Sequence, residues 1–326
     1  MLADFAEFGV PVLLISGGEP LTRIDILDLA VYARSLGMRV TLSTNGTLIT
    51  PYIAKRIAEI GVGYVGISLD GVEATHDTFR GQAGAFEAAL QGLRNCRAAK
   101  LRTGLRLTLT RHTVQDLDGL FEIVEREGIE RVCFYHLVPS GRGRFIQDDL
   151  LTPRETRAAV DSIIRRADDY VQRGMPIEIL TVDNHTDAAY LYLWALREKG
   201  PEVAERIRAE ARRGGGNRSG IAIAHVDFRG QVHPDQFWWQ AALGNVRLKP
   251  FSTIWSDTSN QLLADLRDRK SLLKGRCHDC RFLDICNGNF RARAASLTGD
   301  QWAPDPACYL SDEEIEVAEA EVSNAS

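Results

Sequence analysis

Four cysteines near the C-terminus carry the strongest chemical signal in this sequence. Two of them are separated by two residues, a third follows after five more, and 21 residues separate the third from the fourth: Cys277, Cys280, Cys286 and Cys308. A tight turn can bring the first two thiolates to one metal centre, and the other two complete a set of four ligands. Zinc and an iron–sulfur cluster both accept four thiolates, and the spacing alone favours zinc.

Polar residues at the ends of predicted strands form a second signal. A Ser-Gly-Gly-Glu-Pro sequence containing Gly17, Gly18 and Glu19 directly follows an apolar segment. Adjacent glycines let a ligand approach the backbone closely, and a carboxylate can accept hydrogen bonds from a ligand amine. Ser68 ends another predicted strand and Arg80 follows it, a pair suited to a ribose and a carboxylate. Taken singly, each feature is equally compatible with an ordinary turn or helix cap.

The elements that must position these residues alternate between strand and helix over the first 150 residues. Short apolar runs predict five strands, at 11–16, 39–43, 64–69, 102–110 and 131–138, with helices between them at 24–36, 50–60, 86–100 and 116–127. Such alternation predicts an α/β fold of parallel strands joined by right-handed crossovers. The Gly- and Asn-containing turns fall at the carboxyl ends of the strands, the edge that carries active sites in such folds.

The rest of the chain has a different pattern. Residues 151–212 predict a helix, a strand over 177–182 and one long helix over 187–212. A glycine-rich linker follows, and two short strands around residues 228–230 predict a hairpin before the cysteine-bearing region. We therefore expect three parts, at residues 1–150, 151–212 and 213–326.

Composition narrows the classes of partner. The chain has 326 residues, of which 44% are hydrophobic and 25% charged, with a formal net charge of -5. This balance is typical of a globular protein with a sizeable core. The negative charge argues against nucleic acid as a partner, and no apolar run is long enough to span a membrane. Clustered thiols without an export signal favour the cytoplasm, and Cys96 and Cys133 are predicted to be structural.

Together these features resemble the radical S-adenosylmethionine (SAM) superfamily. The Gly-Gly-Glu-Pro sequence is similar to the motif that holds the SAM methionyl amine, and Thr-Asn-Gly at 44–46 and Ile-Ser-Leu-Asp-Gly at 67–71 are similar to its later strand ends. The resemblance implies a SAM-binding set made of Gly17, Gly18, Glu19, Asn45, Ser68 and Arg80. The C-terminal cysteines resemble a SPASM/twitch-type auxiliary domain, which favours a 4Fe–4S cluster over zinc. The implied fold is a partial (β/α)6 barrel lacking its first strand, plus a small C-terminal iron–sulfur domain.

Within the superfamily the resemblance is to the radical SAM protein of haem d1 biosynthesis, carried by the segments 230–235, 237–239, 243–246 and 286–289. It implies an enzyme that acts on the propionate side chains of a didecarboxysirohaem-type tetrapyrrole, with an electron donor such as flavodoxin or ferredoxin. Aromatic and basic side chains suit a flat substrate rimmed with carboxylates. The candidates are Arg106, Arg142, Arg144, His136, His233, Trp238 and Trp239. A peptide-modifying SPASM maturase and a catalytically inactive cluster-binding partner remain alternatives.

One departure from the superfamily pattern stands out. The CxxxCxxC motif that holds the SAM-cleaving cluster is absent from the sequence. We therefore expect an N-terminally truncated form of a complete enzyme, with one auxiliary cluster here and a second, SAM-binding cluster only in the full-length protein. This chain alone is expected not to cleave SAM.

Overall fold

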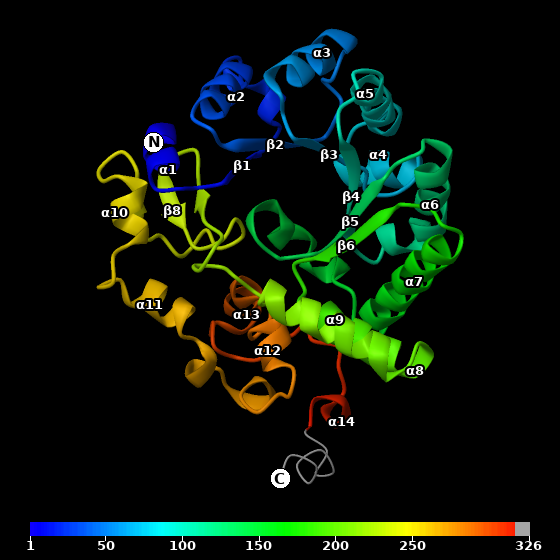
Figure 1. Cartoon of the computed structure of the whole chain (residues 1–326), viewed down its shortest axis with the longest axis vertical. Helices are drawn as coiled ribbons and strands as arrows, with labels where there is room; N and C mark the ends of the chain where they lie inside the picture. The colour runs from blue at the N-terminus through cyan, green and yellow to red at the C-terminus, as the bar shows by residue number, and fades with distance from the viewer. Residues whose placement is uncertain (317–326) are drawn as a thin grey trace. The chain divides into compact units, whose positions relative to one another are not determined.

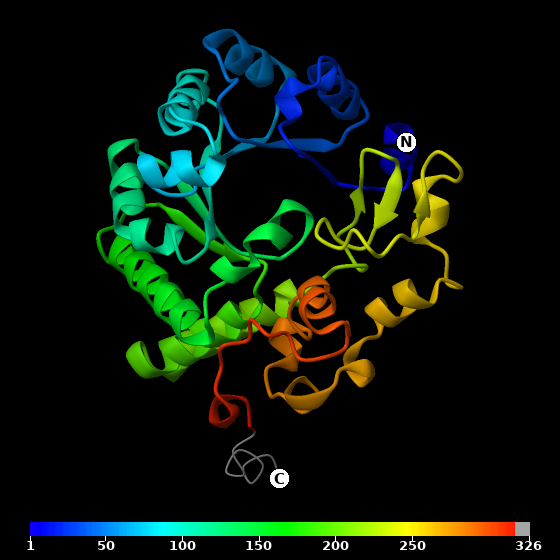
Figure 2. The same ribbon diagram turned by 180° about the vertical axis from the view of Figure 1, so that it is seen from behind.

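The structure, a computed structural model, describes residues 1–316 apart from the side chain of Arg142. The chain divides into two compact units, shown from opposite sides in Figures 1 and 2. The first unit consists of residues 1–136 and 165–182, and the second consists of residues 137–164 and those from 183 onward. Each unit is thus built from two separate stretches of sequence.

The first unit is a repeating βα structure. Its elements are α1 (Leu2–Glu7), β1 (Val12–Ile15), α2 (Ile26–Ser35), β2 (Arg39–Thr44), α3 (Pro51–Ile60), β3 (Tyr64–Ser68), α4 (Ala74–Arg80), α5 (Ala85–Ala98), β4 (Thr103–Leu109), α6 (Leu117–Arg126), β5 (Arg131–His136) and β6 (Glu178–Val182). Helix α7 (Pro153–Gln172) has residues in both units.

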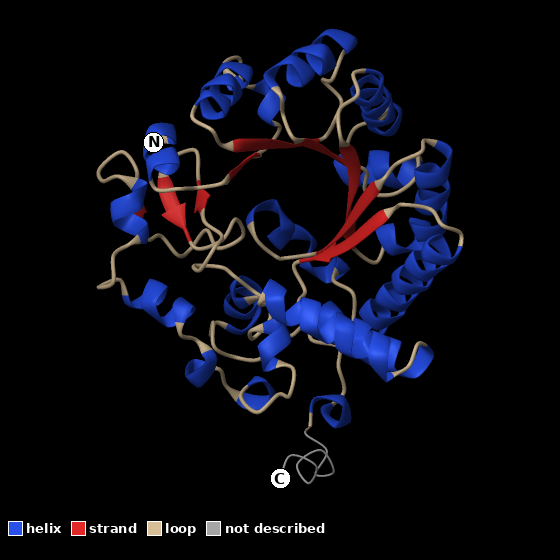
Figure 3. Ribbon diagram, in the orientation of Figure 1, coloured by secondary structure: helices blue, strands red, loops and turns tan. Residues whose placement is uncertain are grey.

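The six strands form one parallel sheet in the order β1-β2-β3-β4-β5-β6. The sheet is curved, and α2, α3, α5 and α6 lie on its convex side (Figure 3). The predicted parallel α/β fold is confirmed, including the five strands expected from residues 1–150. The strand at 177–182, which the sequence alone did not join to the others, pairs with β5 as the sixth strand.

Side-chain alternation gives the sheet two different faces. In β4, Leu105 and Leu107 are fully buried on the helix-covered face. Arg106 and Thr108 alternate with them and therefore point to the opposite, concave face. In the parallel register Ser68 lies opposite Arg106, so polar side chains of neighbouring strands meet on that face.

The turn after β2 is held in place by direct backbone packing. Gly92, in the middle of α5, lies so close to the carbonyl oxygen of Gly46 that a Cβ at this position would overlap with it. Gly46 itself has a φ of 79°, which favours glycine. The helix thus positions the turn that carries Asn45 without any intervening side chain.

The second unit is mostly helical. Its elements are α8 (Thr186–Glu198), α9 (Pro201–Gly214), β7 (His225–Val226), β8 (Gln231–His233), β9 (Gly244–Asn245), α10 (Phe251–Trp255), α11 (Gln261–Arg267), α12 (Leu283–Cys286), α13 (Arg291–Thr298) and α14 (Asp312–Ile315). The predicted hairpin is confirmed, because β7 and β8 pair antiparallel. The single helix predicted over 187–212 is wrong: Gly200, with a φ of 86°, and Pro201 at the first helical position separate α8 from α9.

In the part of the chain that the structure describes, no helix has both the length and the apolar character needed to cross a membrane.

Candidate functional site

Glu19 ties together the carboxyl ends of β1 and β2. Its Oε1 accepts a hydrogen bond from Thr44 Oγ1 at 2.7 Å, and its Oε2 accepts one from the backbone N–H of Asn45, also at 2.7 Å. A Cβ added to Gly17 or Gly18 would meet nothing within 4 Å, so open space lies beside the backbone of this turn. An anchored carboxylate beside an open glycine turn is well suited to accept hydrogen bonds from a ligand amine.

The end of β3 is organised by a buried carboxylate, Asp70, which the sequence analysis treated only as part of a turn. Asp70 is 1% exposed, pairs with the Arg80 guanidinium, and accepts a hydrogen bond from Thr108 N at 2.7 Å. Its own N–H donates to His76 Nδ1 at 2.9 Å. Burial lowers the pKa of His76, which keeps this ring nitrogen available as an acceptor. Asp70, two residues beyond Ser68, therefore fixes the Arg80 side chain.

Arg106 projects from β4 onto the concave face and is held by hydroxyl groups. It donates to Ser43 Oγ and to the Tyr135 hydroxyl, and its guanidinium carbon lies 4.5 Å from the centre of the Tyr135 ring. Gly66 leaves the room that its side chain occupies, since a Cβ there would press on Arg106 Cδ. The partners that the structure gives Arg106 are thus two hydroxyl groups and an aromatic ring, all of them neutral. A cation with only neutral partners is available to an anionic ligand group.

The other residues proposed for substrate binding lie in different environments. His136 is buried, on the same side of β5 as Phe134, and the Arg144 guanidinium lies over the Phe145 ring at 4.6 Å. The side chain of Arg142 lies outside the described residues. Because these candidates belong to two units, a common substrate site stays a prediction.

The aromatic candidates of the second unit differ in exposure. Trp238 is 5% exposed and packs in a hydrophobic cluster, whereas Trp239 is 42% exposed. The Trp239 ring lies 5.9 Å from that of His233 and 5.7 Å from that of His225, centre to centre. Of these two tryptophans, Trp239 is thus the one that presents aromatic surface outside the core.

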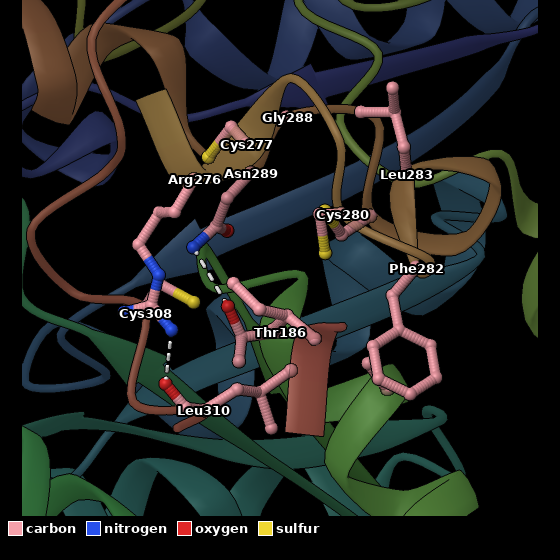
Figure 4. Close-up of a pocket in the computed structure, with 13 residues that line it drawn as sticks. Thr186, Arg276, Cys277, Cys280, Phe282, Leu283, Gly288, Asn289, Cys308 and Leu310 are labelled. Atoms are coloured by element: carbon pink, nitrogen blue, oxygen red, sulfur yellow. Dashed lines mark hydrogen bonds between the residues drawn. The ribbon is translucent and has the colours of Figure 1, made fainter. Parts of the chain in front are cut away.

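All four C-terminal cysteines line one apolar cavity (Figure 4). Cys277 ends a short 3-10 turn and Cys286 ends α12, after which Asn287 and Gly288 both adopt positive φ and turn the chain back. The walls between the thiols are formed mainly by Ala189, Phe282, Leu283, Leu310 and Ile315. The fold therefore gathers the cysteines that the sequence singled out.

The electrostatics of this cavity oppose free thiolates. Burial raises the pKa of Cys286 to about 12, and the neighbouring Cys280 adds to the effect. Burial likewise raises the pKa of Cys277 and of Cys280. Thiolates there need a positively charged partner, which a metal centre supplies. Within residues 1–316, no group of three or more His, Cys, Asp or Glu side chains is arranged to hold a single metal ion.

A buried ion pair braces the loop that carries Cys308. Asp305 accepts hydrogen bonds from Arg293 Nε and Nη2, both at 2.9 Å, and from the backbone N–H groups of Phe290 and Ala307 at 3.0 Å. Burial raises the pKa of Asp305, but the charge and hydrogen bonds of Arg293 outweigh it and lower the pKa overall. The sign of this network in the sequence is the Arg-Ala-Arg run at 291–293, which lies between Cys286 and Cys308.

Sequence comparison identifies the class of protein that this fold and cavity define. A profile of the radical SAM superfamily matches residues 1–124. The chain belongs to the radical SAM superfamily, whose cofactors are SAM and 4Fe–4S clusters. It is 50% identical over 323 residues to Fe-coproporphyrin III synthase of Methanosarcina barkeri, a match that covers 98% of this chain and 81% of the relative.

A second relative and a solved structure agree with this assignment. The chain is 44% identical over 310 residues to pre-heme d1 synthase of Dinoroseobacter shibae, covering 95% of this chain and 76% of the relative. It therefore belongs with the tetrapyrrole-modifying radical SAM enzymes. The structure of anSMEcpe with bound AdoMet and a peptide is 16% identical, has a TM-score of 0.69, and covers 99% of this chain and 89% of its own. The fold and the family predicted by resemblance are both confirmed.

Proposed function

We propose that this chain is a radical SAM enzyme, or part of one, that acts on the propionate side chains of a didecarboxysirohaem-type tetrapyrrole in haem d1 biosynthesis. The observation that carries the proposal is the high identity, over nearly the whole chain, to relatives named as tetrapyrrole synthases. Arg106 supports it, because a cation held by hydroxyls on the concave face suits a propionate.

One specific observation favours a different product, Fe-coproporphyrin III. The relative with 50% identity is named Fe-coproporphyrin III synthase, whereas the pre-heme d1 synthase is 44% identical. Mass spectrometry of the product that a form of the enzyme carrying a CxxxCxxC motif makes from a didecarboxysirohaem-type substrate separates the two assignments. Conversion of propionates toward ring carbonyl groups supports the haem d1 assignment, and Fe-coproporphyrin III as the product contradicts it.

For the SAM site we propose the strand-end residues of the first unit. Glu19 accepts hydrogen bonds from the methionyl amine beside the open turn of Gly17 and Gly18, and Asn45 shapes the neighbouring turn. Ser68 and Arg80 hold the ribose and the carboxylate, with Asp70 fixing the arginine. When bound and reductively cleaved, SAM supplies a 5′-deoxyadenosyl radical that abstracts a substrate hydrogen atom.

We further propose that this polypeptide alone does not cleave SAM. The sequence contains no CxxxCxxC motif, so the first cluster, and with it the iron that binds the SAM amine and carboxylate, has no ligand set here. Incubation with SAM and dithionite followed by chromatography is the test. Release of 5′-deoxyadenosine would contradict the proposal.

For the four-cysteine cavity we propose an auxiliary 4Fe–4S cluster with Cys277, Cys280, Cys286 and Cys308 as ligands. The apolar walls and the unfavourable thiolates support a resident iron centre. Anaerobic reconstitution should give about four irons and four sulfides per chain, as expected for one such cluster. One zinc and no sulfide would overturn the assignment. Free cysteines throughout the described residues favour a reducing cytoplasm, with flavodoxin or ferredoxin as electron donor.

Substrate binding can be measured without SAM cleavage. Tetrapyrrole titration followed by absorbance should show saturable binding, and Arg106→Met should weaken it roughly tenfold to a hundredfold, since a charge-assisted hydrogen bond contributes about 1.5–3 kcal/mol. Arg102→Met removes an exposed arginine just before the same strand and is the matched control. Binding of a peptide instead of the tetrapyrrole would favour a SPASM maturase. Tetrapyrrole turnover that never appears, even in a chain extended to include CxxxCxxC, would favour a catalytically inactive partner.

A further inference from the structure

Arg291 is a fully buried arginine whose hydrogen bonding is incomplete. Its side chain is 0% exposed, and its Nη1 donates to the carbonyl oxygens of Gln301 and Ala303, each at 2.8 Å. Its Nε and Nη2 have no hydrogen-bond partner among residues 1–316. Leaving charged donors unsatisfied in a protein interior is strongly unfavourable. The two free N–H groups therefore point to an acceptor that the polypeptide itself does not provide.

The neighbourhood of Arg291 indicates what kind of acceptor this is. Arg291 opens α13, directly after the turn that follows Cys286, and its charge interacts with the thiols of Cys277 and Cys286. The nearby carboxylate, Asp305, is already engaged in the two-bond pair with Arg293. The missing partner must therefore be anionic or strongly accepting, and the interaction with two of the four thiols makes a cluster bound by them the candidate.

A second buried arginine strengthens the case for a missing anion. Arg269 is 1% exposed and is held by neutral groups, Asn217 Oδ1 and the carbonyl oxygens of Leu266 and Ser219. Its charge and that of Arg291 repel each other. Two buried cations with no carboxylate of their own are easier to accommodate if a negatively charged group occupies the cavity.

We propose that Arg291 donates its Nε–H and Nη2–H to sulfur atoms of the auxiliary cluster and thereby raises the reduction potential of that cluster. The inference rests on the proposed four-cysteine cluster. A 4Fe–4S centre with four thiolate ligands is anionic, and one-electron reduction adds a further negative charge. A buried cation therefore stabilises the reduced form more than the oxidised form, and hydrogen bonds to cluster sulfurs act in the same direction. Arg291 is in this sense a positioning residue that tunes the reduction potential of the cluster.

Arg276 provides a control beside the same thiols. It lines the four-cysteine cavity, but its side chain is 31% exposed, and it pairs with Asp312 and with the carbonyl oxygen of Leu310. Solvent and the acidic partner screen its charge. The Nε of Arg276 is also buried without a partner, but its guanidinium has an acidic partner and reaches solvent. Removing Arg276 deletes the same formal charge, so it separates the effect of a fully buried arginine without a counter-ion from that of charge in general.

The experiment is a redox titration of the reconstituted chain, followed by electron paramagnetic resonance of the reduced cluster. Arg291→Met should lower the equilibrium constant for one-electron reduction at least tenfold, which corresponds to a shift of about 59 mV to lower potential. Arg276→Gln should change it less than threefold. Arg291→Lys keeps the charge but loses the two-donor fork, and should lie between the parent and the methionine variant.

The possible outcomes distinguish a failure of this proposal from a failure of the cluster assignment on which it rests. A parent chain that takes up no iron and sulfide refutes the cluster assignment itself. A parent with a full cluster, and a methionine variant whose potential is unchanged, overturns the role of Arg291 alone. Equal shifts in the Arg291→Met and Arg276→Gln variants also overturn it. If the methionine variant does not reconstitute, the lysine variant decides, because an unaltered potential and spectrum there contradict hydrogen bonding by the fork.

Discussion

The Asp305–Arg293 pair should dominate the stability of the second unit, and Asp305→Asn tests this. Both side chains are 0% exposed, so water solvates neither charge and each depends on the other for stabilisation. Asparagine keeps the size of the side chain and one acceptor oxygen. It removes the negative charge, however, and leaves the Arg293 guanidinium buried without a counter-ion. The backbone N–H groups of Phe290 and Ala307 also compete for the remaining oxygen.

The expected magnitude follows from burial. Breaking a buried ion pair from one side destabilises a protein by about 3–5 kcal/mol, because the remaining charge stays in the interior. For a unit of this size, about 2–4 °C of melting temperature corresponds to each kcal/mol. The variant should therefore melt roughly 6–20 °C below the parent. The double variant Asp305→Asn with Arg293→Met should recover part of the loss, since no uncompensated charge remains.

Thermal unfolding followed by circular dichroism, together with urea titration, measures the effect. Asp300→Asn is the matched control, because Asp300 pairs with Lys274 at the surface, where the two side chains are 35% and 62% exposed. That substitution should leave the melting temperature nearly unchanged. An Asp305→Asn variant that melts within 2 °C of the parent would refute the reasoning, as would equal losses in both variants.

Three further predictions concern other parts of the chain. Gly92→Ala should destabilise the first unit by about 1–3 kcal/mol, because the added methyl group overlaps the turn after β2. Gly214→Ala should stabilise the protein by about 0.5–1 kcal/mol, because an added Cβ there meets nothing within 4 Å. Urea titration compares the free energies of unfolding of the two variants. The hydrogen bonds from Arg157 lower the pKa of Glu314, so the stability from this pair is complete above the ordinary glutamate pKa of about 4.3 and is lost as the pH falls through the lowered value. Glu314→Gln should therefore flatten the acid limb of a stability–pH curve, and an unchanged limb would contradict this. Cys308→Ala should reduce the iron and sulfide retained after gel filtration, and full retention would exclude Cys308 as a ligand.

Much of the fold could be predicted because its signals are local. The parallel strands and their order of appearance follow from short apolar runs that end in glycine-containing turns, and these strands were found. The joining of β6 to β5 could not be predicted, since residues 137–177 separate them and pairing over such a distance leaves no local trace. The break between α8 and α9 could have been predicted from the Gly-Pro pair at 200–201.

Some residues of the candidate site could likewise be predicted from local sequence, and others could not. The cysteines and the glycine turn were predicted because their residue types and spacing are rare outside such chemistry. Asp70 was missed because its importance lies in its pair with Arg80 of α4. Ser43 and Tyr135 were missed because they matter through contacts with Arg106, which comes from a different strand. Arg291 was missed for another reason: arginine is ordinarily a surface residue, and only its complete burial makes it informative.

The interleaving of the two units has a consequence for how the protein is made. The chain leaves the first unit at residue 136 and returns to it only at residue 165, within α7. A nascent chain that has released β5 from the ribosome therefore still lacks the sixth strand, and the edge of β5 stays open until residue 182 has emerged. During that interval the open edge is a target for mispairing or for a chaperone. Splitting the gene at either of these two crossings would separate the two stretches of the first unit, so neither half would contain that unit complete.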